Sequence, residues 1–304
     1  MPQKKQLIVI GGPTAVGKTG LAVRLARHYD CPILSADSRQ FYREMNKGTA
    51  KPSAAELAAA EHYFIDNLSI EDAYSVGDYE REAIRILSEI FVEKDRAILV
   101  GGTGLYLRAV CEGLDEFPKI PEAINANLEK ELKANGLPKL VHELEEKDPE
   151  YHSTADLSNP HRVMRALAVI RATGKTFSSF RTRKITPRPF DCVHIGLTDD
   201  REKLYDRINK RVDKMVENGL IEEARALYPQ RHLKSLQTVG YQEYFKYFAG
   251  EISEAEATEL VKRNSRRYAK RQMTWFRNQR PAEGERHFFG VHEFEEILRI
   301  IERE

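Results

Sequence analysis

A glycine-rich stretch near the start of the chain has the spacing of a phosphate-binding loop. From Gly12 it reads GPTAVGKT, which is G-x-x-x-x-G-K-T. In such a loop the backbone N–H groups surround a diphosphate, the lysine supplies a point charge, and the last hydroxyl can bind Mg²⁺. The predicted diphosphate-binding residues are Gly12, Pro13, Thr14, Ala15, Val16, Gly17, Lys18 and Thr19, with Thr19 also the predicted metal ligand.

Two other short segments carry side chains that could take part in catalysis. Asp37 follows the apolar run CPILSA, and Thr103 lies in GGTGLY. A carboxylate beside a phosphate loop could accept a proton from an incoming nucleophile, and a hydroxyl could orient that nucleophile. Asp37 could instead only cap a helix. Nucleotide hydrolases of this class need a Mg²⁺-binding acid at the end of a hydrophobic strand. AILVGGTG has Gly and Thr there, which argues against ATP hydrolysis.

The segments around these residues alternate between strand and helix patterns. QLIVIGG, CPILSADS, DRAILVGG and FDCVHIGLT are short apolar runs, and KTGLAVRLARHY has apolar residues at helical spacing. This alternation predicts an α/β fold with a P-loop NTPase-like parallel sheet flanked by helices. Because parallel strands bind ligands at their carboxyl ends, the phosphate loop, residues 37–40 and residues 101–106 are expected to lie together.

A change of pattern near Gly113 predicts a second domain. Between residues 113 and 190, helical segments are divided by Asn, Gly and Pro with no strand between them. We therefore expect an all-helical insertion domain at 113–190 and a P-loop α/β core with C-terminal helices at 1–112 and 191–304. The 304 residues, 41% of them hydrophobic, suffice to form both cores.

Composition narrows the classes of protein. No stretch approaches the roughly 18 apolar residues that a membrane span needs, so a cytoplasmic protein without a membrane partner is expected. The three cysteines, Cys31, Cys111 and Cys192, form no C-x-x-C pair and have no histidine at ligand spacing. They predict buried free thiols rather than disulfides or a structural zinc site.

Charge is unevenly distributed although the net charge is only +1. Two segments hold eight basic residues each and no acid, so the rest of the chain is acidic. They comprise Arg162, Arg165, Arg171, Lys175, Arg181, Arg183, Lys184 and Arg188, and Lys262, Arg263, Arg266, Arg267, Lys270, Arg271, Arg277 and Arg280. Cations without local counter-charges favour a polyanionic partner, although two solvated helix faces would have the same pattern.

Several motifs in this order resemble the bacterial tRNA dimethylallyltransferases, also called isopentenyl-tRNA transferases. They are GPTAVGKT, SADSRQFY, GGTGLYLRA, HRVMRAL..I..TGK, RV..M...GL..EA, VGYQE and AKRQMTWFR, and they extend from about residue 7 to 280. The resemblance implies transfer of a dimethylallyl group from dimethylallyl diphosphate to N6 of the adenosine just 3′ of a tRNA anticodon. It also implies release of diphosphate with Mg²⁺ as cofactor, and a P-loop that binds a prenyl diphosphate.

The resemblance and the chemistry together assign roles. Asp37 is the candidate base, Thr103 the residue that orients the amine, and Arg211 the catalytic cation, although Arg211 could be only a surface charge. The residues expected to meet the anticodon stem-loop are Asp37, Ser38, Arg39, Gln40, Thr103, Asn125, Asn159, Pro160, His161, Arg162, Val163, Thr238, Val239, Gly240, Tyr241, Arg266, Arg267 and Arg271. Trp275 and Phe276 could stack on a base or pack in the core. A monomer is expected.

Two departures from the family pattern concern tRNA contacts only. Asn125 stands where the family often has Arg, and Asn159-Pro160 where it often has Asn-Asp. Three alternative functions remain open at this point. An adenylate isopentenyltransferase would need neither basic segment. A small-molecule kinase could use the same loop and an Asp on the second strand, and an RNA-binding regulator could keep the loop as a nucleotide sensor.

Overall fold

The computed structural model describes residues 5–182, 184–282 and 284–303 and divides into two compact units. The first unit comprises residues 1–112 and 187–304, and the second comprises Gly113–Thr186. Arg183, one of the basic residues noted above, lies outside the described residues. Each unit has its own hydrophobic core.

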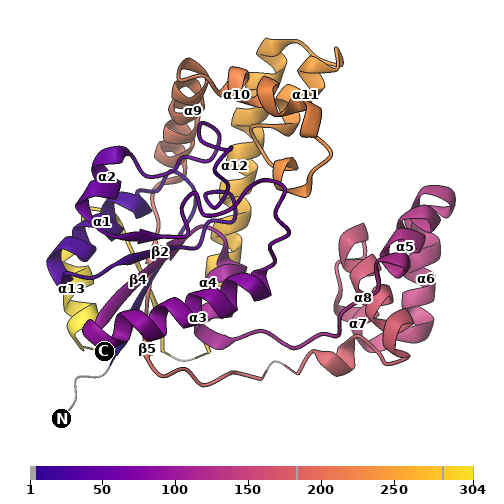
Figure 1. Cartoon of the computed structure of the whole chain (residues 1–304), viewed down its shortest axis with the longest axis horizontal. Coiled ribbons are helices and arrows are strands. Elements are labelled where there is room, and N and C mark those ends of the chain that lie inside the picture. Colours follow the sequence, from indigo (N-terminus) through magenta and orange to yellow (C-terminus); the bar gives the residue numbers. More distant parts are fainter. Residues whose placement is uncertain (1–4, 183, 283, 304) are drawn as a thin grey trace. The chain divides into compact units, whose positions relative to one another are not determined.

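The first unit contains a six-stranded parallel sheet (Figure 1). Its strands lie in the order β3-β2-β4-β1-β5-β6, and every pairing is parallel. The strands are β1 (Gln6–Gly11), β2 (Ile33–Ser35), β3 (His62–Tyr63), β4 (Arg96–Gly101), β5 (Asp191–Leu197) and β6 (Arg286–Phe289). Four of them are the strands predicted from the sequence. β3 and β6 were not predicted, and β6 lies in the C-terminal part of the chain that was expected to be mostly helical.

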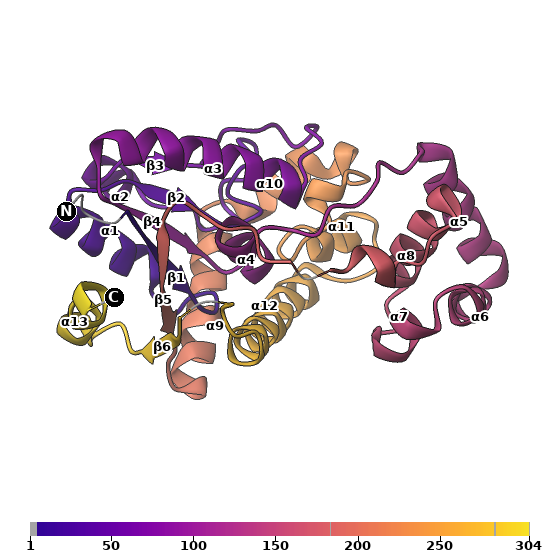
Figure 2. The ribbon, with the colours of Figure 1, turned by 90° about the horizontal axis from the view of Figure 1, so that it is seen from below.

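Helices cover both faces of this sheet, and the strand sequences reflect that. Successive side chains of a strand point to opposite faces. Ile8 and Ile10 pack with α1 (Lys18–Tyr29), α9 (Arg201–Glu217) and α13 (Phe294–Arg303), while Leu7 and Val9 pack with α3 (Val76–Glu93) and α4 (Gly104–Glu112). Figure 2 shows α3 and α13 on opposite sides of the strands. Because both faces of the sheet are covered, successive side chains of these strands are all buried, and this explains their continuous apolar runs.

Other helices of the first unit form a third cluster beyond the carboxyl ends of the strands. α10 (Leu220–Leu227), α11 (Gln242–Phe248) and the first half of α12 (Glu254–Asn278) pack around Tyr241 and Tyr244, which are fully buried. The short helix α2 (Ala54–Ala59) begins at Ser53, which forms a capping box with Glu56. No helix among the described residues is long and apolar enough to cross a membrane.

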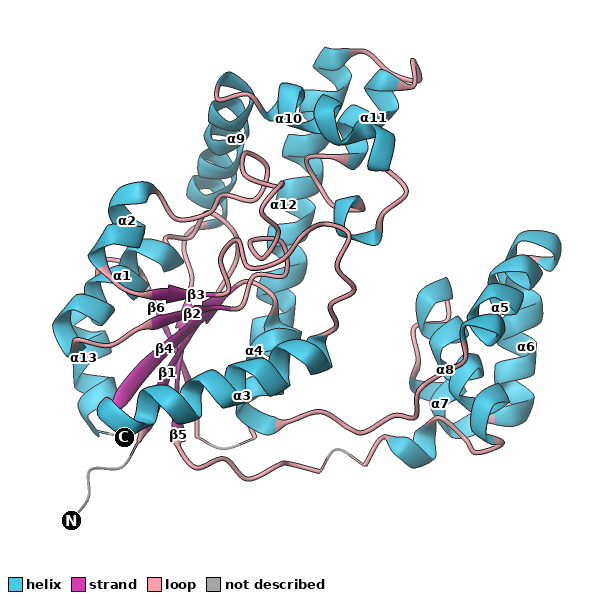
Figure 3. Ribbon diagram, in the orientation of Figure 1, coloured by secondary structure: helices cyan, strands magenta, loops and turns pink. Residues whose placement is uncertain are grey.

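The second unit contains only helices and loops in its described part (Figure 3). They are α5 (Glu122–Asn135), α6 (Leu137–Lys147), α7 (Pro149–Thr154) and α8 (Pro160–Thr173), and they enclose a core around Leu144 and Leu167. The buried Asp148 caps α7 by accepting the Tyr151 N–H at 3.0 Å, and it also accepts the Ser178 N–H at 2.7 Å. This carboxylate ties the segment after α8 to the start of α7.

Candidate active site

The phosphate loop joins β1 to α1, with its residues at the amino end of that helix. Gly17 is the N-cap of α1 and has a φ of 105°, a left-handed conformation that favours glycine. Lys18 and Thr19 form the start of α1, and the first turn contains no acid. Unpaired N–H groups and the helix dipole make such a helix start favourable for an anion. The side chain of Val16 is buried, so this position can offer only its backbone.

Three charged side chains converge over the loop. The ammonium of Lys18 donates a hydrogen bond of 2.7 Å to the carbonyl of Pro13, and Arg211 donates one of 3.2 Å to the Thr14 hydroxyl. Burial lowers the pKa of Lys18 to about 8, the Asp37 carboxylate opposes this shift, and Arg211 adds to it. Burial also lowers the pKa of Arg211, again against the influence of Asp37. Burial disfavours the charged forms of both side chains, so a bound anion would stabilise these two cations.

Asp37 and Thr103 lie at the carboxyl ends of β2 and β4, and the structure brings their loops together. The N–H of Ser38 lies 3.5 Å from the hydroxyl oxygen of Thr103. Asp37 accepts the Arg39 N–H at 3.0 Å, and turns rather than a helix follow it. Asp37 therefore does not cap a helix, which was the alternative role that the sequence had left open.

Two cavities meet at these residues. The first, of about 600 Å³, is lined by the loop residues Lys18 and Thr19 among others. The second, of about 290 Å³, is lined by Ser38 and by residues 238–240. Four residues line both cavities, namely Thr14, Asp37, Arg211 and Tyr268. The arrangement can hold two different reactants and bring them together at Asp37 and Arg211.

Tyr268 and Gln272, both on α12, belong to this site and were not singled out by the sequence analysis. Burial and the nearby Asp37 carboxylate raise the pKa of Tyr268. The Gln272 side chain accepts the Thr14 N–H at 2.8 Å and donates to the Gly102 carbonyl at 2.9 Å. A Cβ on Gly102 would lie 2.2 Å from the Gln272 amide nitrogen, so a larger residue there would displace this amide from its hydrogen bonds. Both residues lie in a strongly basic segment, and Gln272 is also part of the motif AKRQMTWFR.

The predicted RNA-contacting residues of the first unit differ in whether their side chains are free to contact RNA. Arg39 donates to the Ser235 carbonyl at 2.9 Å, and the Gln40 amide donates to the Ala50 carbonyl at 3.0 Å. Thr238, Val239 and Gly240 line the second cavity. The Tyr241 side chain is fully buried and donates to Glu223 at 2.7 Å. Any contact from Tyr241 to RNA is therefore limited to its backbone.

The predicted contacts of the second unit surround the start of α8. Asn159 caps this helix by accepting the N–H groups of His161 and Arg162, and Pro160 occupies the first turn. His161 and Arg162 are exposed, whereas the Val163 side chain is fully buried in the core of the unit. Asn125 is exposed on α5.

The expectation of cations without counter-charges is wrong for three members of the basic segments. Arg171 lies between Glu131 and Glu143, donating to Glu131 at 2.7 Å. Arg188 pairs with Glu80, and Lys262 pairs with Asp213 and Glu259. These acids lie outside the basic segments. Glu259 is three residues before Lys262 on α12, whereas the other four reach their cations through the fold. Arg267, Lys270, Arg271 and Arg277 are exposed on α12, and Arg266 donates to Asn209.

Two further expectations concern Trp275 and the cysteines. Phe276 is 2% exposed and packs in the core with Trp275, so of the two roles considered for this pair the structure favours core packing over stacking on a base. Cys31 and Cys111 are buried free thiols, as predicted, while Cys192 is partly exposed. The sequence showed no histidine at ligand spacing from a cysteine, yet the fold brings His194 of β5 beside Cys111 and Cys192.

A parallel sheet with a glycine-rich loop between β1 and α1 defines an α/β protein of the P-loop class, here with a helical unit of residues 113–186 inserted. The IPP transferase family model matches residues 40–279. The chain is 55% identical over 271 residues to the tRNA dimethylallyltransferase of Christiangramia forsetii, covering 89% of this chain and 90% of that protein. It is 46% identical over 298 residues to the tRNA dimethylallyltransferase of Cytophaga hutchinsonii, covering 98% and 97%.

A solved structure has the same fold over nearly its full length. The tRNA isopentenylpyrophosphate transferase of Bacillus halodurans superposes with a TM-score of 0.72 at 38% identity, covering 99% of this chain and 98% of that one. The chain therefore belongs to the IPP transferase family.

Proposed function

We propose that the protein transfers a dimethylallyl group from dimethylallyl diphosphate to N6 of the adenosine just 3′ of a tRNA anticodon, releasing diphosphate. Family membership and the names of its relatives support this reaction. The observation that carries the proposal is the meeting of two cavities at Asp37 and Arg211. The cavity with the phosphate loop suits the diphosphate, and the other suits an extruded base.

In the proposed reaction, the bond between the allylic carbon and the diphosphate oxygen breaks, and its electrons remain on diphosphate. Lys18, Arg211 and the N–H groups at the start of α1 stabilise this developing charge. Preorganised donors of this kind, shielded from water, are usually the largest contribution to catalysis. Arg211 lines both cavities, so its guanidinium is placed to stabilise the oxygen that leaves with the diphosphate.

The acceptor nitrogen needs help because its lone pair is drawn into the adenine ring. Asp37 accepts the proton of the amine as the carbon–nitrogen bond forms, and Thr103 orients the amine. The proximity of the Asp37 and Thr103 loops supports these roles, since a base and an orienting group must reach the same atom.

The residues at the start of α1 fit a magnesium ion. Thr19 offers a hydroxyl into the cavity that holds the loop, and oxygen donors are what Mg²⁺ prefers. Thr19 and the oxygens of the diphosphate would hold the ion. When bound, Mg²⁺ would neutralise part of the charge of the leaving group.

One assay tests the reaction and its acceptor. The protein is mixed with Mg²⁺, labelled dimethylallyl diphosphate and either tRNA with adenosine beside the anticodon or free AMP. We expect label in tRNA only, and no labelling once a chelator removes Mg²⁺. Label in AMP instead of tRNA would identify an adenylate prenyltransferase, and label in neither would overturn the proposal.

We also propose that the protein acts as a monomer in the cytoplasm. One chain supplies both cavities, so no second copy is needed to complete the site. Sedimentation of the protein alone and with tRNA should give the mass of one chain and of a one-to-one complex. A stable dimer at working concentrations would contradict the first part, and recovery of the protein outside the cytoplasmic fraction would contradict the second.

A further inference from the structure

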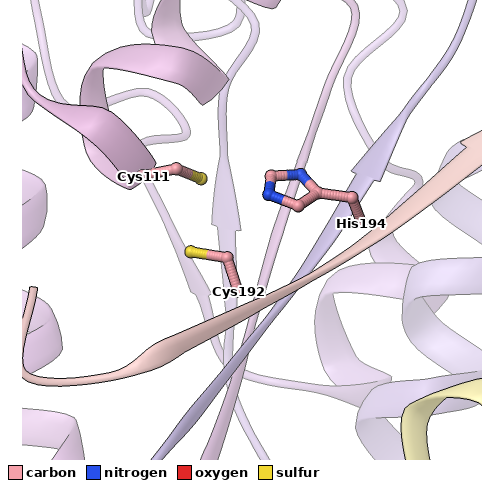
Figure 4. A group of neighbouring side chains, drawn as sticks. All are labelled: Cys111, Cys192 and His194. Carbon is pink, nitrogen blue, oxygen red and sulfur yellow. The ribbon is translucent and has the colours of Figure 1, made fainter. Parts of the chain in front are cut away.

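Three side chains with metal-binding atoms converge where α4 packs on β5. Cys192 and His194 are two residues apart on β5 and so point to the same face of the sheet, and Cys111 lies in the last turn of α4. One ligand atom from each residue lies within 4.8 Å of the other two. Figure 4 shows both sulfur atoms on the side of the His194 ring that faces α4. Neither cavity of the proposed active site is lined by any of the three.

The His194 imidazole is buried without the hydrogen bonding that such a group normally has. His194 is only 5% exposed, and its Nδ1 has no hydrogen-bond partner among the described residues. Buried polar atoms are rarely left unpaired, because they give up their bonds to water without replacement. Figure 4 shows that the ring nitrogen facing the two sulfur atoms is Nε2, so a cation held by all three residues would bind Nε2 and leave Nδ1 unpaired.

The protonation states of the three groups are compatible with metal binding. Burial, with a smaller contribution from the cation Arg286, lowers the pKa of His194 to about 4, so the ring is neutral near pH 7 and has a free lone pair. A hydrogen bond with Cys192 and burial raise the pKa of Cys111, so this thiol keeps its proton while no metal is bound. A thiophilic cation displaces thiol protons as its bonds to sulfur form.

We propose that Cys111, Cys192 and His194 form a binding site for one Zn²⁺ ion, separate from the magnesium that the transfer reaction uses. Two thiolates and a neutral imidazole are a common zinc donor set, and the two negative charges neutralise the ion. Because Cys192 is partly exposed, a water molecule can complete the tetrahedron. The two thiol protons leave to solvent as the two sulfur–zinc bonds form.

The geometry requires only a small adjustment. Bonds of about 2.3 Å to sulfur and 2.0 Å to nitrogen place tetrahedral ligands roughly 3.5–3.8 Å apart. The widest pair here is at most 4.8 Å apart, so it must close by no more than about 1.3 Å. Side-chain rotation can supply such a change. The ion would then fasten the last turn of α4 to β5, and α4 begins directly after Thr103.

The consequence is structural and does not depend on the proposed reaction. α4 follows the Gly102–Thr103 loop, and Gln272 binds the Gly102 carbonyl. A zinc ion at the other end of α4 would hold this helix at both ends. Zinc binding should therefore raise the thermal stability of the protein, because an ion that binds only the folded state stabilises it.

The test is metal titration of the reduced, metal-free full chain. Co²⁺ replaces Zn²⁺ as a spectroscopic probe, since bound thiolates give a sulfur-to-cobalt absorption band that oxygen ligands do not. We expect one Co²⁺ per chain with this band, its displacement by Zn²⁺, release of about two protons per ion, and a higher melting temperature with Zn²⁺. Absence of the thiolate band from the reduced wild-type protein would overturn the proposal.

Variants locate the site. Cys111→Ser and Cys192→Ser should each weaken Zn²⁺ affinity by more than the roughly 10–100-fold typical of substitutions around a metal site. Cys31→Ser is the matched control, because Cys31 is a buried free thiol in a different core cluster, and it should bind Zn²⁺ normally. A band unchanged in both variants would place the metal elsewhere. If Cys192→Ser fails to fold, the wild-type titration still decides the question.

Discussion

The side chain of Gln272 connects α12 to the phosphate loop, accepting the backbone N–H of Thr14 at 2.8 Å. The same amide donates to the Gly102 carbonyl at 2.9 Å, and Gln272 is only 6% exposed. One buried residue of the basic helix therefore holds the loops at the ends of β1 and β4.

Gln272→Glu should impair both stability and transfer. A carboxylate can accept from Thr14 but cannot donate to the Gly102 carbonyl, so two acceptors would face each other in a buried site. An unsatisfied buried group costs about 1–3 kcal/mol. We expect the free energy of unfolding to fall by about this amount, and the prenyl diphosphate to bind more weakly than to the wild type. Denaturant unfolding and a binding titration measure these quantities.

The matched control is Gln279→Glu, the same substitution at an exposed position at the end of α12. It should leave stability within about 0.5 kcal/mol of the wild type. Equal losses of stability from the two substitutions would show that the hydrogen bonds of Gln272 to Thr14 and Gly102 are unimportant.

Asp37→Ala should lower the turnover of prenyl transfer by a factor on the order of 10² or more, the range usual for removal of a general base, with tRNA affinity nearly unchanged. Asp37→Asn separates charge from shape, because the amide oxygen can still accept the Arg39 N–H as the carboxylate does at 3.0 Å. Both variants should be equally slow in single-turnover assays. Near-normal turnover in either variant would eliminate Asp37 as the base, and Asp206→Ala, at an exposed position on α9, is the control.

Lys18 should make diphosphate binding depend on pH above neutrality. Burial lowers its pKa in the folded protein to about 8 from 10.5. The unfolded chain therefore holds more protons between about pH 8 and 10.5, and this group makes the protein more stable as pH rises through that window. Below about pH 8 Lys18 is charged and destabilises the free protein, which a bound diphosphate would reverse.

Affinity for dimethylallyl diphosphate should accordingly fall as pH rises above about 8, by up to tenfold per pH unit. Titration calorimetry at several pH values measures this dependence and the proton taken up on binding. Lys18→Arg keeps the charge at every pH used, so its affinity should vary much less over the same range. A wild-type affinity that is flat between pH 7.5 and 9.5 would contradict the role of Lys18.

Binding of tRNA should depend steeply on salt through the exposed face of α12. Neutralising Arg266, Arg267 and Arg271 together should flatten the slope of log affinity against log salt by about 0.7–0.9 for each RNA phosphate that these cations neutralise in the wild type. Filter binding at several salt concentrations gives the slope. Since Arg266 also donates to Asn209, its share of the change in slope should be smaller than the share of each of the other two.

The control removes the same charge from another surface. Arg27, Arg81 and Arg85 are exposed on α1 and α3. Neutralising them together changes the net charge equally, so a specific RNA interface on α12 predicts an almost unchanged slope. Equal flattening in the two triple variants would mean that only total charge matters.

The sequence by itself determined four strands of the sheet, the phosphate loop and the family. Four strands were predicted correctly because buried parallel strands require unbroken apolar runs, and the loop was recognisable because its glycines and Lys18 have a fixed spacing. β3 and β6 were missed because strands of two and four residues at the edges of a sheet carry too little pattern. The family was recognisable because seven motifs occur in one order along most of the chain, and such a combination is far more specific than any single motif.

Only the tertiary structure decided which distant residues meet. The acids that neutralise Arg171 and Arg188, and Asp213 beside Lys262, lie far away in the chain, so charge counted along the sequence could not find them. Gln272 lies 258 positions from Thr14, and Cys111 and His194 come from different elements. Such contacts depend on how helices pack on the sheet. Local sequence patterns predict single helices and strands, but they do not specify which distant elements pack together.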